Sequence, residues 1–151
     1  MATWKFKGLD KYVLQLEQLS AHAEGQMKAA VYEGAKVVAD RIKSAMQTIP
    51  TQDGYVQPGK MRAGPTTEEK EGMIAGFGLS KMRTGSEVST KAGFSGTTGG
   101  VSNATIARQV ASGTSWMRKH PAIRQAVNAS KGAAEAAMAR KLEQIIAQYN
   151  K

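Results

Sequence analysis

Residues 27–45 decide the fold class, and they read Met-Lys-Ala-Ala-Val-Tyr-Glu-Gly-Ala-Lys-Val-Val-Ala-Asp-Arg-Ile-Lys-Ser-Ala. Apolar residues recur in this stretch every three or four positions, the spacing that places them on one face of an α-helix, and charged residues fill the positions between them. The stripe also extends toward the N-terminus: its members are Tyr12, Leu16, Leu19, Ala23, Met27, Ala30, Gly34, Val37, Val38, Ile42 and Ala45. We therefore predict one long amphipathic helix, which Asp10 caps and Pro50 terminates.

Two features flank or interrupt this helix. Trp4 and Phe6 alternate with lysines just before it, which predicts a short strand. Gly25 and Gly34 lie within the helix, and each is expected to mark either a bend or a close contact with a neighbouring element.

A second long helix is predicted at the other end of the chain. Pro121 suits its first turn, and many alanines favour a helix and permit close packing. Its apolar positions at helical spacing are Ile123, Val127, Ser130, Ala134, Met138, Leu142, Ile145 and Tyr149.

The segment between the two helices carries turn and strand signals. Breakers such as Asp53-Gly54 and Gly64-Pro65 predict a long flexible loop over residues 51–72. Period-two apolar runs at 73–79 and 88–94 predict an antiparallel pair of strands, followed by a second flexible loop over residues 95–104. Ile106 and Val110 indicate a short apolar element before Gly113. Residues 1–151 are thus expected to form a single α+β domain, with a small antiparallel sheet packed against the two long helices.

Composition narrows the classes of function. The chain has 151 residues and no cysteine, which excludes disulfide scaffolds, cysteine zinc sites and thiol nucleophiles. No apolar run approaches the roughly 20 residues of a membrane helix, and residues 1–5 lack an apolar signal core, so a soluble protein is expected. The net charge is +9: residues 1–75 hold 10 basic and 9 acidic side chains, whereas residues 76–151 hold 11 and 3. The positive electrostatic field of the second half favours acidic partners, either nucleic acid or an acidic protein surface.

The residues that could carry chemistry do not assemble into a site. His22 and His120 lie far apart without carboxylates at ligand spacing, so we predict neither a metal nor a cofactor. Residues 93–100 are rich in glycine, but no Lys-Ser or Lys-Thr follows and no helix is predicted to start there, so a hairpin tip is preferred over a phosphate loop. The carboxylates of Glu68, Glu69 and Glu71 are expected to be solvated. No catalytic residue is assigned, and an enzyme is not expected.

One cluster of cations includes an aromatic side chain. Trp116, Arg118, Lys119 and Arg124 combine the residue types that single-strand binders use, although no nucleic-acid motif surrounds them. A small basic DNA-binding protein that contacts the phosphate backbone is therefore kept as the alternative function. Trp116 could instead fill the core beside the start of the last helix.

Several short motifs resemble one known family. These are Lys7-Gly8-Leu9-Asp10 at the start of the chain, residues 33–40 of the first helix leading to Ile49-Pro50-Thr51, and Gly113-Thr114-Ser115 followed by Pro121-Ala122-Ile123. Through these motifs the chain resembles the tail-component family of long-tailed bacteriophages. This family comprises the head–tail joining or tail-completion proteins of the HK-type lambdoid phages. Two positions depart from the family pattern: Gln52-Asp53-Gly54-Tyr55 follows the proline, and Ala111-Ser112 precedes Gly113.

The resemblance implies a structural virion protein of the neck or tail. Such a subunit would assemble into a ring with copies of itself and contact other neck, connector or tail-tube proteins, with contact to packaged DNA left open and no membrane partner. It would reside in the virion, and in the host cytoplasm during assembly. Candidate interface residues, chosen from the predicted loops and the basic cluster, are Tyr55, Lys60, Met61, Phe94, Trp116, Arg118 and Lys119.

Overall fold

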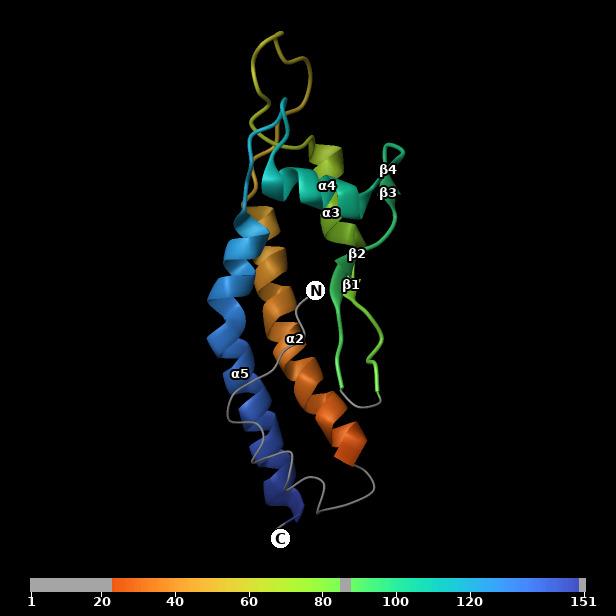
Figure 1. Ribbon diagram of the computed structural model, residues 1–151, viewed down its shortest axis with the longest axis vertical. Coiled ribbons are helices and arrows are strands. Elements are labelled where there is room, and N and C mark those ends of the chain that lie inside the picture. The colour runs from red at the N-terminus through yellow and green to blue at the C-terminus, as the bar shows by residue number, and fades with distance from the viewer. Residues whose placement is uncertain (1–22, 85–87, 150–151) are drawn as a thin grey trace. The chain divides into compact units, whose positions relative to one another are not determined.

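Helices and short strands follow one another in the order α2, α3, β1, β2, β3, β4, α4 and α5 in the computed structural model, which describes residues 23–84 and 88–149 (Figure 1). The helices are α2 (Ala23–Gln47), α3 (Thr67–Gly76), α4 (Asn103–Ser112) and α5 (Ala122–Tyr149). The strands are β1 (Phe77–Leu79), β2 (Ala92–Phe94), β3 (Thr97–Thr98) and β4 (Val101–Ser102). Long helices toward both ends and small antiparallel sheets between them confirm the predicted α+β class.

The end of α2 and the start of α5 lie at the prolines from which they were predicted. Thr48 and Ile49 continue the last turn of α2 through hydrogen bonds to Ala45 and Met46, and Pro50 then stops it. Helix α5 begins directly after Pro121. The predictions made for residues 1–22, namely the strand at Trp4 and Phe6, the cap at Asp10, the first part of the stripe and His22, lie outside the described residues.

Contacts divide the chain into two compact units, and each long helix contributes to both. The described residues of the first unit are 23–38, 79–84, 88–91 and 130–149, and those of the second unit are 39–78 and 92–129. No helix within the described ranges is both long and apolar enough to cross a membrane.

The first unit is built on the packing of α2 against α5. Ala30, Leu142 and Ile145 form a buried cluster, which Met27 and Ile146 cover. Gly34 allows the two helices to approach, because a Cβ atom built there would lie 2.5 Å from Cγ of Met138 and 3.3 Å from the carbonyl oxygen of Ala134. The predicted close contact is therefore confirmed at Gly34. A Cβ atom at Gly25 would meet nothing within 4 Å.

The core of the second unit lies where α3 packs against α4. Its fully buried large side chains come from the end of α2 and from these two helices: Met46, Ile49, Met73, Ile106 and Val110. The predicted apolar element around Ile106 and Val110 is thus helix α4, which ends at Gly113.

Helix α3 overturns part of the prediction for the central segment. Residues 67–72 were expected in a loop and Met73 in a strand, but residues 67–76 are helical. Thr66 caps this helix: its hydroxyl accepts from the backbone N–H of Glu69, while the Glu69 carboxylate accepts from the N–H of Thr66. This reciprocal capping box satisfies two backbone donors that the start of a helix otherwise leaves free. The strand begins only at Phe77.

The antiparallel pairing predicted between the two runs is present, although its strands are shorter than expected. Strands β1 and β2 are neighbours, and the backbone N–H of Ser95 donates to the carbonyl of Gly76 at 2.8 Å. Farther along the hairpin, Ser80 donates to Lys91 at 2.7 Å and Arg83 forms an antiparallel bridge with Ser89. Val88 and Thr90 therefore lie in the hairpin but outside β2.

The glycine-rich segment contains regular structure that was not predicted. Strands β3 and β4 pair with Thr97 opposite Ser102, so residues 97–102 form a tight hairpin. Helix α4 follows immediately, with Ser102 as its N-cap, and the expectation that no helix starts here is wrong. Asn103 is buried and holds the segment in place: its amide accepts from Thr98 Oγ1 at 2.7 Å and donates to the carbonyl of Ser95 at 2.8 Å.

Candidate functional site

Two loops of the second unit, residues 50–66 and 113–121, lie side by side. Arg62 and Met117 form a parallel bridge: the N–H of Arg62 donates to the carbonyl of Trp116 at 2.7 Å, and the N–H of Arg118 donates to the carbonyl of Arg62 at 3.0 Å. Backbone hydrogen bonds of this kind fix the spacing and direction of both segments. The pairing brings together candidate residues that are far apart in the sequence.

The first loop is closed on itself by Gln52 and Arg62. The N–H of Gln52 donates to the carbonyl of Pro65 at 2.9 Å, and its side-chain oxygen accepts from the N–H of Ala63 at 2.7 Å. The guanidinium of Arg62 donates to the carbonyl of Gln52 at 2.9 Å and lies 3.9 Å from the carboxylate of Glu69. Arg62 therefore ties together this loop, its partner loop and the start of α3.

Further polar contacts anchor the first loop to the helices beside it. The carboxylate of Asp53 accepts from the hydroxyl and the backbone N–H of Thr67, and these hydrogen bonds, with a smaller contribution from Arg62, lower the pKa of Asp53. The ammonium of Lys70 donates to the carbonyls of Gln47 at 2.7 Å and Ile49 at 2.9 Å. These carbonyls end α2 and lack helical partners, so the lysine also complements the negative end of the helix dipole.

The second loop is shaped by a turn that exposes one large side chain and buries the next. Thr114 Oγ1 accepts from the backbone N–H groups of Trp116 and Met117. Met117 is almost fully buried, whereas Trp116 is 58% exposed, so the alternative that Trp116 fills the core is wrong. Nε2 of His120 hydrogen-bonds the carbonyl of Ala63 and links the end of this loop to the first.

Six of the seven candidate residues lie in this pair of loops, and five of them lie next to the bridge or close to it in sequence. We call Lys60, Met61, Trp116, Arg118 and Lys119 the basic–aromatic platform; all five side chains are exposed. They flank the Arg62–Met117 bridge, Lys60 and Met61 on one side and Trp116, Arg118 and Lys119 on the other. Exposed apolar side chains cost hydration free energy in an isolated molecule, and aromatic, Met and Arg residues are enriched where proteins meet.

The remaining two candidates lie outside the platform. Tyr55 belongs to the same loop as Lys60 and is 82% exposed. Phe94 is half-buried in β2, and its ring lies 5.4 Å from that of Phe77 in a tilted arrangement. Phe94 is therefore part of the packing of the second unit.

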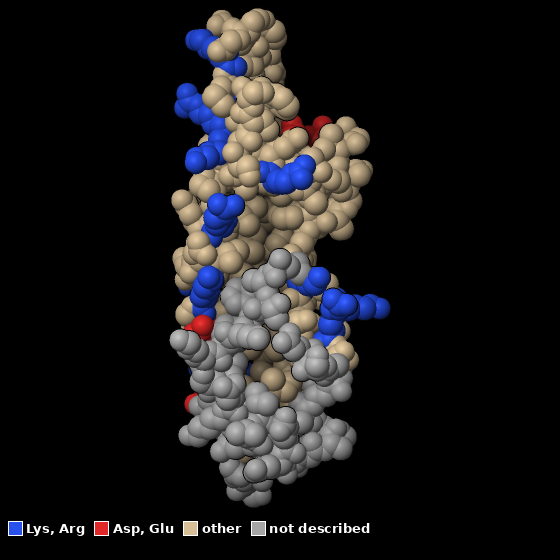
Figure 2. All heavy atoms as spheres, viewed as in Figure 1, with Lys and Arg blue, Asp and Glu red and all other residues tan. Residues whose placement is uncertain are grey.

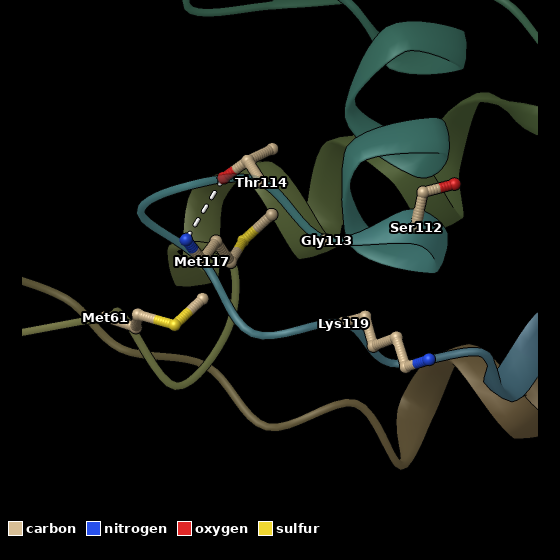
Figure 3. Close-up of a pocket in the computed structure, with 6 residues that line it drawn as sticks. All are labelled: Met61, Ser112, Gly113, Thr114, Met117 and Lys119. Atoms are coloured by element: carbon tan, nitrogen blue, oxygen red, sulfur yellow. Dashed lines mark hydrogen bonds between the residues drawn. The ribbon is translucent and has the colours of Figure 1, made fainter.

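A shallow pocket of about 340 Å³ opens beside the platform. Met61 and Met117 lie on one side of it and Lys119 on the other, and Ser112, Gly113 and Thr114, where the chain leaves α4, complete the lining (Figure 3). Gly113 has a φ of +75°, and a Cβ atom there would lie 2.9 Å from Cβ of Lys119, so the close passage of the chain requires glycine. The pocket is thus lined by two thioether side chains and by the side chain of Lys119, whose ammonium end points away from the two methionines (Figure 3).

Charge in the second unit is unevenly distributed. The segment 88–134 contains no acidic residue, and it includes Arg118, Lys119 and Arg124. In the upper part of Figure 2, which holds α3, α4 and both loops, most Lys and Arg side chains lie along the left edge, further Lys or Arg atoms lie near the middle, and Asp and Glu appear at the upper right. Within residues 39–78 and 92–129 the one ion pair is that of Arg62 with Glu69.

The residues that position the platform were missed from the sequence. Gln52, Arg62 and Thr114 act through backbone contacts that only the folded chain reveals. The N-terminal cap of α3 could have been found in the sequence, because Thr66-Thr67-Glu68-Glu69 has the Thr-x-x-Glu spacing of a capping box. No group of three or more His, Asp or Glu side chains in residues 23–84 and 88–149 is arranged to hold a metal ion.

Comparisons with protein-family models, with curated proteins and with solved structures found no match to this chain.

Proposed function

We propose that this chain is a structural virion protein of a tailed bacteriophage, a neck or tail-completion subunit that assembles into a ring joining tail to head. The sequence motifs that resemble the tail-component family support the phage assignment. The basic–aromatic platform supports the assembly role. The proposal assigns the chain no catalysis and no cofactor, and it places the protein in the virion and, before assembly, in the host cytoplasm.

The exposure of Trp116 and Met61 on hydrogen-bonded loops is the observation that carries the proposal. A large aromatic side chain held by ordered backbone presents contact area at little further cost in conformational entropy, which is what interface hot spots require. The flanking Lys60, Arg118 and Lys119 add a charged rim. Such a rim directs encounter and register, whereas the apolar centre supplies most of the affinity.

The test is the mass of the purified protein by light scattering, at low and high salt, with and without duplex DNA. We expect a discrete multimer of the 16.1 kDa chain that persists at high salt and ignores DNA. A protein that stays at the mass of one chain under all of these conditions would contradict self-assembly into a ring.

The second candidate function is binding of DNA through its phosphate backbone. Trp116 is exposed beside Arg118 and Lys119, the combination of a stacking platform with cations that nucleic-acid binders use. DNA affinity should then fall steeply with salt, because each phosphate contact releases counterions. A monomer that binds DNA at low salt and releases it at high salt would favour this function over the ring.

A further inference from the structure

A second charged surface lies on the exposed face of α3. Thr67, Glu68, Glu71 and Ala75 are exposed and recur at helical spacing, whereas Glu69 and Met73 turn toward the protein. Glu69 forms the capping box with Thr66 and an ion pair with Arg62. Glu68 and Glu71, in contrast, make no ion pair among the described residues of the second unit. We call Glu68, Glu71 and Ala75 the acidic face of α3.

The acidic face and the basic–aromatic platform belong to the same unit but do not pair with each other. Lys60, Arg118 and Lys119 are exposed and, within the described residues of that unit, also make no ion pair. In Figure 2 most of the blue atoms of this part lie at the left edge and the red atoms lie at the upper right, next to further blue atoms near the middle. Each copy therefore carries two surfaces of opposite charge on different elements, one on α3 and one on the paired loops.

We infer that the basic–aromatic platform of one copy binds the acidic face of α3 on a second copy, head to tail. This inference rests on the proposed ring and names the contact that builds it. A contact between two different patches leaves one patch free at each end of a pair, so further copies add until the ring closes. A self-complementary contact would stop at the dimer.

The residue types on the two surfaces fit this pairing. Lys60, Arg118 and Lys119 oppose Glu68 and Glu71, and Trp116 can lie over Ala75, the small exposed residue one helical turn beyond Glu71. Met61 and Met117 line the pocket, so the aliphatic part of a glutamate can rest against the two thioethers. The charge complementarity favours a second copy over DNA, because the acidic face would repel phosphate.

The test is a charge swap followed by light scattering. The variant R118E/K119E loses the basic surface, and E68K/E71K loses the acidic one, so each alone should assemble roughly tenfold or more weakly than the natural chain. An equimolar mixture should recover multimers, because the reversed surfaces of one variant complement those of the other. The variant R41E/K131E changes the net charge as R118E/K119E does, at exposed helix positions outside both surfaces, and should assemble normally.

Recovery on mixing is the result that only a direct contact between these surfaces predicts. If the natural chain forms a multimer and both swapped variants assemble as it does, the head-to-tail contact is wrong and the proposed ring stands on another interface. If both variants fail and the mixture stays monomeric, the pairing of these two surfaces is also wrong. If the natural chain is a monomer that binds DNA, the proposed function fails together with this inference.

Discussion

Asn103 shows how one polar residue can order a segment that its composition makes look flexible. Its side-chain amide accepts a hydrogen bond from the hydroxyl of Thr98 and donates one to the carbonyl of Ser95. Its backbone N–H donates to the carbonyl of Gly96 at 3.0 Å. Residues 95–104 contain three glycines and no large apolar anchor before Val101, so the sequence predicts a flexible loop. The order comes from one buried side chain whose partners lie within eight positions, a pattern that periodicity does not register.

Replacing Asn103 with alanine should therefore destabilise the protein. The substitution leaves the half-buried Thr98 hydroxyl and the carbonyl of Ser95 without these partners, which predicts a loss of about 1–3 kcal/mol in the free energy of unfolding. Urea denaturation measures it. Asn128→Ala, at an exposed position of α5, is the matched control and should change stability by less than about 0.5 kcal/mol. Equal stability of the two variants would show that the Asn103 network does not support the fold.

At the scale of elements, the sequence predicts long periodic helices well and short capped ones poorly. Both long helices and their buried stripes follow from spacing alone, and the buried positions Ala30, Ile42, Ala134, Met138 and Leu142 belong to the predicted faces. Helix α3 was missed because Met73, Ala75, Phe77 and Leu79 alternate as a strand would. Only the last three residues of that run, from Phe77, are extended, because the capping box at Thr66 starts a helix upstream.

The approach of α2 to α5 at Gly34 gives a prediction at this scale. Gly34→Ala should destabilise the protein by about 1–3 kcal/mol, because the new methyl group meets the buried side chain of Met138 and overpacks the helix contact. Gly132→Ala is the matched control, since a Cβ atom there meets nothing within 4 Å. That control should stabilise the protein by about 0.5–1 kcal/mol through helix propensity. Thermal unfolding of both variants measures these changes in stability. A Gly34→Ala variant that is more stable than the natural chain would contradict the close contact.

At the scale of the whole molecule, composition predicts the charge of a partner but not the surface that would meet it. The excess of basic residues after residue 75 predicted an acidic partner. The bridge between Arg62 and Met117 determines which of these basic residues lie together. It pairs two irregular loops, and such a pairing leaves no periodic signal in the sequence. The same holds for the acidic face, because its residues were assigned to a loop until α3 placed them on one side of a helix.

The most direct test of the head-to-tail contact is a disulfide between two copies. The chain has no cysteine, so Lys119→Cys and Glu71→Cys each introduce a single thiol without background. Both positions are exposed, one on the platform and one on the acidic face of α3. A disulfide forms only when the two Cα atoms come within about 7 Å, so cross-linking reports the contact itself.

The measurement is oxidation of an equimolar mixture of K119C and E71C, with one of them carrying a tag, followed by a non-reducing gel. We predict a covalent dimer that contains one tagged and one untagged chain, and far less dimer from either variant alone. A mixture that forms no mixed dimer, or single variants that cross-link as readily as the mixture, would contradict head-to-tail assembly through the platform and α3.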